Sequence, residues 1–112
     1  MPTVHRIPAD GPLLRSGADA LGLIYEEGAG EAEWIAVPAA RLDPSFFTLS
    51  SGVAGEFVQK FANYGQRLAI VGDISGPVGE SDALRDFVRE SNRGRQVWFV
   101  ADNDELARRL SG

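Results

Sequence analysis

Two uninterrupted apolar runs, Leu68–Val71 and Val97–Ala101, constrain the fold of this chain more than any other feature. A strand with one wet face alternates apolar and polar side chains, whereas a run without alternation is buried on both faces. Buried runs of this kind are typical of the central strands of an α/β sheet. We therefore expect the two runs to be adjacent central strands, each almost wholly buried.

Two further strands are predicted nearer the amino terminus. Trp34–Val37 is short, apolar and stopped by Pro38, which indicates another buried strand. Val4–Ile7 alternates, but prolines at positions 2, 8 and 12 surround it. Because proline cannot donate to a β-ladder, this segment is at most a short edge strand, and its lone His5 is expected to be an exposed or edge side chain rather than a catalytic one.

Helices are predicted where apolar side chains recur at i, i+1, i+4 and i+5 behind a capping side chain. The longest such pattern runs from Ser51 to Asn63, with Gly65 placed to end it in the left-handed conformation. Three other predicted helices begin behind Ser16, Ser81 and Asp102.

Three segments between these elements need separate interpretations. The residues after Ser16 favour a helix ended by Gly28 and Gly30, although a hairpin running from Leu21 to Val37 is the alternative. The segment 42–47 is expected to be a turn or single helical turn that inserts two phenylalanines into the core. Glycine and proline cluster in the segment 74–80, which predicts a loop.

The alternation of strands and helices predicts an α/β fold: about four strands in a mixed sheet, with helices packed on it. The chain has 112 residues, a length that suits one domain. We expect a single domain over residues 1–112, with a short proline-rich segment at 1–14 and a core at 16–111.

Composition excludes several classes of function. With 11 basic and 16 acidic side chains, a net charge of −5, the chain lacks the basic surplus of a nucleic-acid-binding protein. The arginines at 85, 89, 93 and 95 alternate with acids, as on a solvated helix face. There is no cysteine and one histidine, so thiolate chemistry and multi-histidine metal centres are excluded, and we expect no metal and no cofactor.

The sequence also predicts the compartment. No apolar run approaches the roughly 18–20 residues that span a bilayer, and the first 20 residues lack a signal-peptide core. We expect a cytoplasmic protein of bacterial type with no membrane partner.

Two groups of residues are candidate sites. Ser50, Ser51 and Gly52 precede the helix that begins near Ser51, where hydroxyls cap free amides and a phosphate would be stabilised by the helix dipole. Asp73 follows a predicted central strand, at the sheet edge where α/β proteins bind ligands. The other candidates for such a ligand loop are Ser75, Ser81 and Asp102.

Several stretches together cover most of the chain: 46–61, 63–64, 68–73, 83–92 and the strand at Phe99-Val100 with its closing helix. They resemble a small bacterial family known as domain of unknown function 4180. The resemblance is firmest over residues 42–111. It implies no activity, because the family has none assigned.

A second resemblance rests on Ser50-Ser51-Gly52, the helix to Asn63 and the strand segment 65–72. This layout is similar to that of STAS domains, the domains of sulfate transporters and anti-sigma-factor antagonists. The resemblance implies a STAS-like arrangement and a regulatory phosphorylation site at Ser51. Leu49 stands where STAS domains prefer aspartate.

We expect from these observations a non-catalytic regulatory or protein-binding module. Its surface around Ser50 and Ser51 would recognise a protein partner or a second copy of the chain. The alternative is a small-ligand-binding protein, or an enzyme that uses carboxylates, with its site in the loops at 73–80 and at Asp102.

Overall fold

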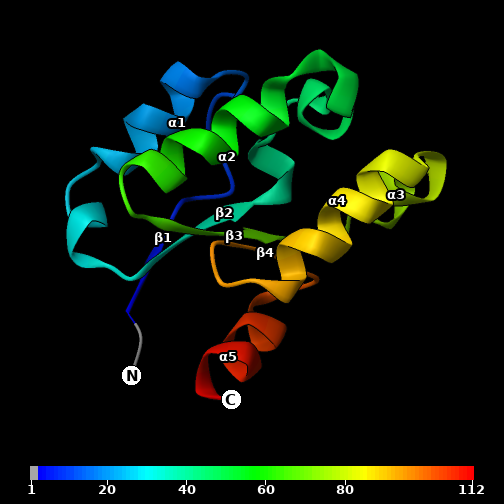
Figure 1. The fold of residues 1–112 in the computed structure, drawn as a ribbon. Coiled ribbons are helices and arrows are strands. Elements are labelled where there is room, and N and C mark those ends of the chain that lie inside the picture. The colour runs from blue at the N-terminus through cyan, green and yellow to red at the C-terminus, as the bar shows by residue number, and fades with distance from the viewer. Residues whose placement is uncertain (1–2) are drawn as a thin grey trace.

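Four parallel strands form one sheet in the order β1-β2-β3-β4, and helices lie on both of its faces (Figure 1). The computed structural model describes residues 3–112, so the first two residues of the predicted proline-rich segment lie outside the described part. The strands are β1 (Val4–Arg6), β2 (Trp34–Pro38), β3 (Arg67–Val71) and β4 (Val97–Val100). The helices are α1 (Gly17–Ile24), α2 (Val53–Asn63), α3 (Ser75–Glu80), α4 (Asp82–Arg93) and α5 (Asn103–Ser111).

Side chains of the strands alternate between two hydrophobic cores, one on each face of the sheet. The core between the sheet and helices α1, α2 and α4, above the sheet in Figure 1, is called the front core here. Its strand residues are Ile35, Val37, Leu68, Ile70, Val97 and Phe99. The back core lies over α5 and comprises Trp34, Ala36, Ala69, Trp98, Val100 and Leu106. Burial on both faces explains why these strands show no polar alternation in the sequence.

The back core is built around two stacked indoles. The rings of Trp34 on β2 and Trp98 on β4 lie 4.1 Å apart between centroids, at an interplanar angle of 29°. The intervening strand β3 contributes the small side chain of Ala69, which leaves room for the stack. The guanidinium of Arg109, on α5, lies 4.0 Å above the Trp98 ring and closes this core by a cation–π contact.

Two predictions about the sheet are wrong. The described strands pair in parallel throughout, not in a mixed sheet, because every connection between successive strands contains a helix that returns the chain to the same end. Leu68–Val71 and Val97–Ala101 are adjacent as predicted, but β4 is an edge strand and Ala101 is exposed beyond its end. The outward amide of Phe99 donates to Oδ1 of Asn92 (2.7 Å), which blocks further strand pairing there.

The first predicted helix is confirmed and the hairpin alternative is wrong. Ser16 caps α1 by accepting a hydrogen bond from the Asp19 amide (3.3 Å). The helix ends at Ile24, before the predicted glycine stop. Tyr25, which follows the helix, is 67% exposed, and its hydroxyl donates to the Tyr64 hydroxyl (2.7 Å).

The predicted loop at 74–80 is instead the short helix α3. The carboxylate of Asp73 accepts a hydrogen bond from the Ser75 amide (2.9 Å) at its start. Pro77 falls in its first turn, where backbone amides have no acceptor within the helix, so the N–H that proline lacks is not needed. Proline and glycine therefore do not prevent one and a half turns of helix here. Within residues 3–112, no helix is both long and apolar enough to cross a membrane.

Candidate functional site

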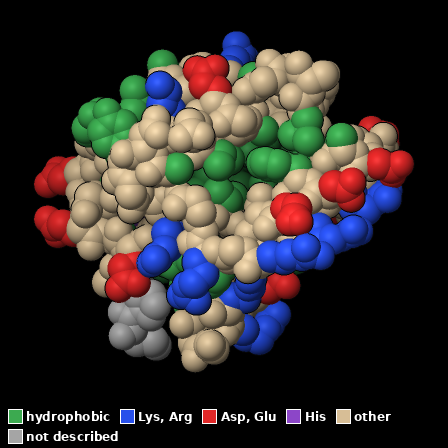
Figure 2. All heavy atoms as spheres, viewed as in Figure 1, with side chains coloured by type: hydrophobic (Ala, Val, Ile, Leu, Met, Phe, Trp, Pro, Cys, Tyr) green, Lys and Arg blue, Asp and Glu red, His purple; other side chains and the backbone are tan. Residues whose placement is uncertain are grey.

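A cleft of about 720 Å³ opens between the segment that follows β2 and the segment that follows β3. One wall consists of two 3₁₀ turns, Pro44–Phe47 and Leu49–Ser51, and the other of α3 and the start of α4. Figure 2 shows hydrophobic side chains gathered in the hollow between α2 and the α3–α4 side of the molecule. The apolar lining residues are Leu42, Pro44, Phe47, Leu49, Pro77 and Ala83.

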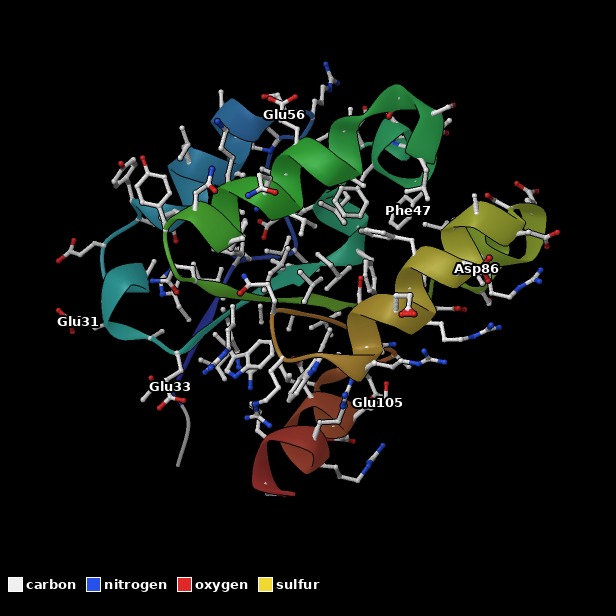
Figure 3. All side chains as sticks on the ribbon, in the orientation of Figure 1. Glu31, Glu33, Phe47, Glu56, Asp86 and Glu105 are labelled. Atoms are coloured by element: carbon white, nitrogen blue, oxygen red, sulfur yellow. The ribbon has the colours of Figure 1, made fainter. Side chains whose placement is uncertain are left out.

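The 3₁₀ wall is held in place by Asp43 and by the adjacent pair of phenylalanines. The carboxylate of Asp43 accepts hydrogen bonds from the hydroxyl (2.6 Å) and the amide (3.0 Å) of Ser45, and these bonds lower the pKa of Asp43. Phe46 is fully buried against Phe57, with ring centroids 5.6 Å apart. Phe47 is therefore left half-buried in the space between α2 and α4 (Figure 3).

The opposite wall is formed where the chain turns from α3 into α4. The Ser81 hydroxyl accepts a hydrogen bond from the Leu84 amide (3.1 Å), so Ser81 caps α4 as predicted. Leu84 is fully buried and anchors this helix on the molecule. Pro77 and Ala83 then face the cleft from either side of the turn, and Glu80 is exposed at its rim.

Two smaller hollows continue the cleft along the carboxyl edge of the sheet. A hollow of about 310 Å³ shares Phe47 and Pro77 with the cleft. A third, of about 260 Å³, shares Gly72, Asp73 and Ile74 with the second and reaches the end of β4. The three together form an elongated apolar trough that passes around α3.

The structure separates the roles of Ser50, Ser51 and Gly52. Ser50 is exposed and lines the cleft. Ser51 is also exposed; its hydroxyl donates to the Ser45 carbonyl (2.6 Å) and accepts from the Val53 amide (3.2 Å). The position that caps α2 is Gly52, with a left-handed φ of 81°, not either serine.

The four ligand-loop candidates do not converge on one point. Asp73 is exposed, and the hydrogen bonds it accepts from Ser75 lower its pKa. Ser81 lines the cleft, whereas Asp73 and Ser75 line the hollow at the end of β4. Asp102 caps α5 by accepting from the Glu105 amide (2.8 Å) and lines none of these three hollows.

The cleft offers apolar contact rather than acid–base chemistry. Its polar side chains are Thr48, Ser50, Glu80 and Ser81, of which only Glu80 carries an ionisable group. In the described part of the chain, no group of three or more histidine, cysteine or acidic residues could hold a metal ion. His5 lies elsewhere, with Nε2 2.9 Å from the Glu26 carboxylate.

Phe47, Leu49 and Pro77 line the cleft but were not predicted as site residues. Both phenylalanines of the 42–47 segment were expected in the core, and only Phe46 is fully buried. A partial signal was present, because neighbouring side chains on a helical turn point about 100–120° apart, so the two phenylalanines cannot be equally deep in the core. Pro77 was assigned to a loop, so its place on a wall could not be anticipated.

Comparison with known proteins gave one match. A family model described as a domain of unknown function (DUF4180) matches residues 2–110. No curated protein and no solved structure matches the chain.

Proposed function

The chain belongs to the DUF4180 family, whose description assigns no activity, and we propose that it is a non-catalytic, protein-binding module with a regulatory role. The observation that carries the proposal is the apolar cleft of about 720 Å³ at the carboxyl edge of the sheet. Contiguous exposed apolar surface on a folded domain marks a place where another molecule docks. We take the module to act in the cytoplasm, as the sequence predicts.

The lining of the cleft favours a protein over a small ligand. Small-molecule sites combine an apolar wall with a few convergent polar groups that fix the ligand's orientation. Here the Ser81 hydroxyl is engaged as a helix cap, and Glu80 is exposed at the rim. The trough also extends past α3 into two further hollows, which suits an elongated partner segment.

A small-ligand-binding function is the second candidate. A volume of about 720 Å³ lies within the range of roughly 300–1,000 Å³ that is usual for ligand pockets. The position at the carboxyl edge of a parallel sheet is also where α/β proteins bind ligands. An enzyme using Asp73 and Asp102 is less well supported, since both carboxylates accept hydrogen bonds from helix-start amides and line different regions.

Photo-crosslinking in cells tests partner binding directly. A photoreactive side chain at Thr48 or Ala83 lies on a cleft wall, and the same group at the exposed Ala107 of α5 is the matched control. We expect a discrete protein adduct from the cleft positions and none from Ala107. If the cleft positions yield no adduct, and a metabolite instead raises the melting temperature of the purified domain, the small-ligand candidate replaces this proposal.

The regulatory part of the proposal concerns Ser51 and follows the STAS-like interpretation of the sequence. Ser51 is exposed next to Ser50, which lines the cleft, and lies at the positive end of the α2 dipole. A phosphate there would add about −1.5 to −2 charges. It would also remove the proton that the Ser51 hydroxyl donates to the Ser45 carbonyl, a bond that ties the two 3₁₀ turns together.

Two substitutions at Ser51 separate a switch from a structural serine. Ser51→Ala should lower the free energy of unfolding by about 0.5–1.5 kcal/mol, because it removes the hydrogen bond that the hydroxyl donates to the Ser45 carbonyl. Ser51→Asp should stay folded, yet lose the crosslinked partner that Ser51→Ala retains. Equal recovery of the partner with both variants would show that Ser51 only supports the wall.

A further inference from the structure

We infer that the occupant of the cleft is an amphipathic α-helix of a partner protein that carries a basic side chain next to its apolar stripe. This inference rests on the proposed function, namely that the cleft binds protein. It adds the conformation and the charge of the segment that docks, which follow from the backbone hydrogen bonding of the walls and from the charges on the rim.

No edge of a sheet strand lies along the walls of the cleft, so an extended peptide has no strand there with which to pair. None of the lining residues belongs to a strand of the sheet, and Leu42, which forms an isolated bridge, is already paired with Leu14. Amides along the walls already donate within the protein: Thr48 to the Ser45 carbonyl (3.2 Å), Gly52 to the Leu49 carbonyl (3.1 Å) and Ser81 to the Val78 carbonyl (3.4 Å). An extended peptide would bury its own backbone groups here without a ladder to join. A helix satisfies its backbone internally, so it can enter an apolar cleft without that cost.

The exposed apolar surface is wider than the cleft itself. Figure 2 shows hydrophobic side chains in the hollow between α2 and the α3–α4 side of the molecule, whereas the cleft is lined by Leu42, the segment 44–50, α3 and the start of α4. Half-buried apolar side chains packed on the front core continue the apolar surface along both helices, namely Val53 and Val58 on α2 and Phe87 on α4.

The charge on the rim of the cleft favours a partner segment with a positive charge. Glu80 is the one titratable side chain among those that line the cleft, and it forms no ion pair with any described residue. The nearby acids of α4 already have basic partners within the protein, since Asp82 pairs with Arg85 (3.0 Å) and Asp86 with Arg89 (3.7 Å). A lysine or arginine beside the apolar stripe of a docked helix complements Glu80, in a chain whose net charge is −5.

Selection from a display library of random 16-residue peptides tests the inference with the whole domain as bait. The peptides recovered should become helical on binding, as measured by circular dichroism, and should share a basic residue beside an apolar i, i+3, i+4, i+7 pattern. Ala83→Trp, which fills the cleft, should abolish their binding. Glu80→Lys should weaken it about three- to fivefold, the size of one exposed charge pair, whereas Glu27→Lys, on an exposed turn distant in sequence, should leave it unchanged.

The failures of the two proposals can be told apart. Cleft-dependent peptides that bind in an extended form, or that carry acids instead of bases, overturn the helix inference and leave protein binding intact. A dimer in solution that Ala83→Trp converts to a monomer makes a second copy of the chain the occupant and likewise overturns it. If the library yields no peptide that is sensitive to Ala83→Trp and the photo-crosslinks are also absent, the proposed function fails as well.

Discussion

A single buried arginine organises the segment that follows β1. Arg41 is only 8% exposed; its Nε donates to the Pro12 carbonyl (3.0 Å) and its Nη1 to the Pro8 carbonyl (2.9 Å). Gly11 lies against the guanidinium so closely that a Cβ there would stand 2.8 Å from Cζ of Arg41. Residues 8–12 are thus held by a side chain from the connection after β2, next to the backbone bond that the Leu14 amide donates to the Arg41 carbonyl (2.7 Å).

Replacing Arg41 should therefore destabilise the fold more than replacing an exposed arginine. Arg41→Ala leaves two carbonyls without their donor and should lower the free energy of unfolding by about 1–3 kcal/mol. Arg41→Lys should recover only part of this loss, since one ammonium on a different stem cannot reproduce the planar fork. Urea denaturation measures both, with Arg15→Ala, which removes an exposed ion pair to Asp43, as the control expected to change little. Equal midpoints for Arg41→Ala and Arg15→Ala would contradict this role.

The pKa of Asp43 reports on the integrity of the cleft wall. Hydrogen bonds from the Ser45 hydroxyl and amide favour the ionised carboxylate and hold the pKa of Asp43 below its ordinary value of 3.8. Because the folded pKa is the lower one, the stabilisation is present above pH 3.8 and is lost as the pH falls through the folded pKa. Ser45→Ala should raise the pKa of Asp43, as measured by carboxyl-carbon NMR. An unchanged pKa would show that the hydroxyl contributes nothing to holding this turn.

At the scale of elements, hydrophobic patterns predicted which segments are buried but not which neighbours they have. The run at 97–101 was expected in the centre of the sheet, and β4 is buried on both faces, yet it occupies an edge. The sequence of β4 is as uniformly apolar as that of a central strand, because α4 and α5 cover its two faces. The Asn92 side chain blocks the outer edge of β4. The sequence pattern also could not predict whether the strands pair in parallel or antiparallel, since the burial of a strand does not depend on the direction of its partner.

Exposed glycines in two helices give an element-scale prediction. Gly22 in α1 and Gly55 in α2 are solvent-exposed, and a Cβ added to either would meet no atom within 4 Å. Alanine at these positions should raise the free energy of unfolding by about 0.5–1 kcal/mol each, because it lowers the entropy of the unfolded chain and favours the helix. Gly72→Ala should do the reverse, since φ is 147° and the new Cβ would lie 2.9 Å from Cβ of Ala39. Thermal unfolding of the three variants checks the signs, and destabilisation by Gly22→Ala would show that this face is constrained in a way the contacts do not reveal.

At the scale of the whole molecule, the cleft contains residues from two candidate sites that the sequence analysis treated as separate. Ser50 was a candidate for partner binding and Ser81 for a ligand loop, and they are 31 positions apart in the chain. Both line the same cleft, because parallel pairing brings the segments after β2 and β3 to one edge of the sheet. No local pattern could show this, since the walls are assembled from side chains of separate crossovers. Only the position at the carboxyl edge followed from the predicted α/β order.

The arrangement of two cores on opposite faces allows stability and cleft binding to be separated by a matched pair of substitutions. Leu106 on α5 and Leu84 on α4 are both fully buried leucines, so Leu→Ala at either should cost about 2–5 kcal/mol of unfolding free energy. Leu106 packs in the back core, away from the cleft, whereas Leu84 anchors the helix whose first turn forms a wall. At a temperature where both variants remain folded, crosslinking from Thr48 should persist in Leu106→Ala and fall sharply in Leu84→Ala. A parallel loss in both would mean that the two faces of the sheet are energetically coupled and that the cleft is not an independent feature of the front face.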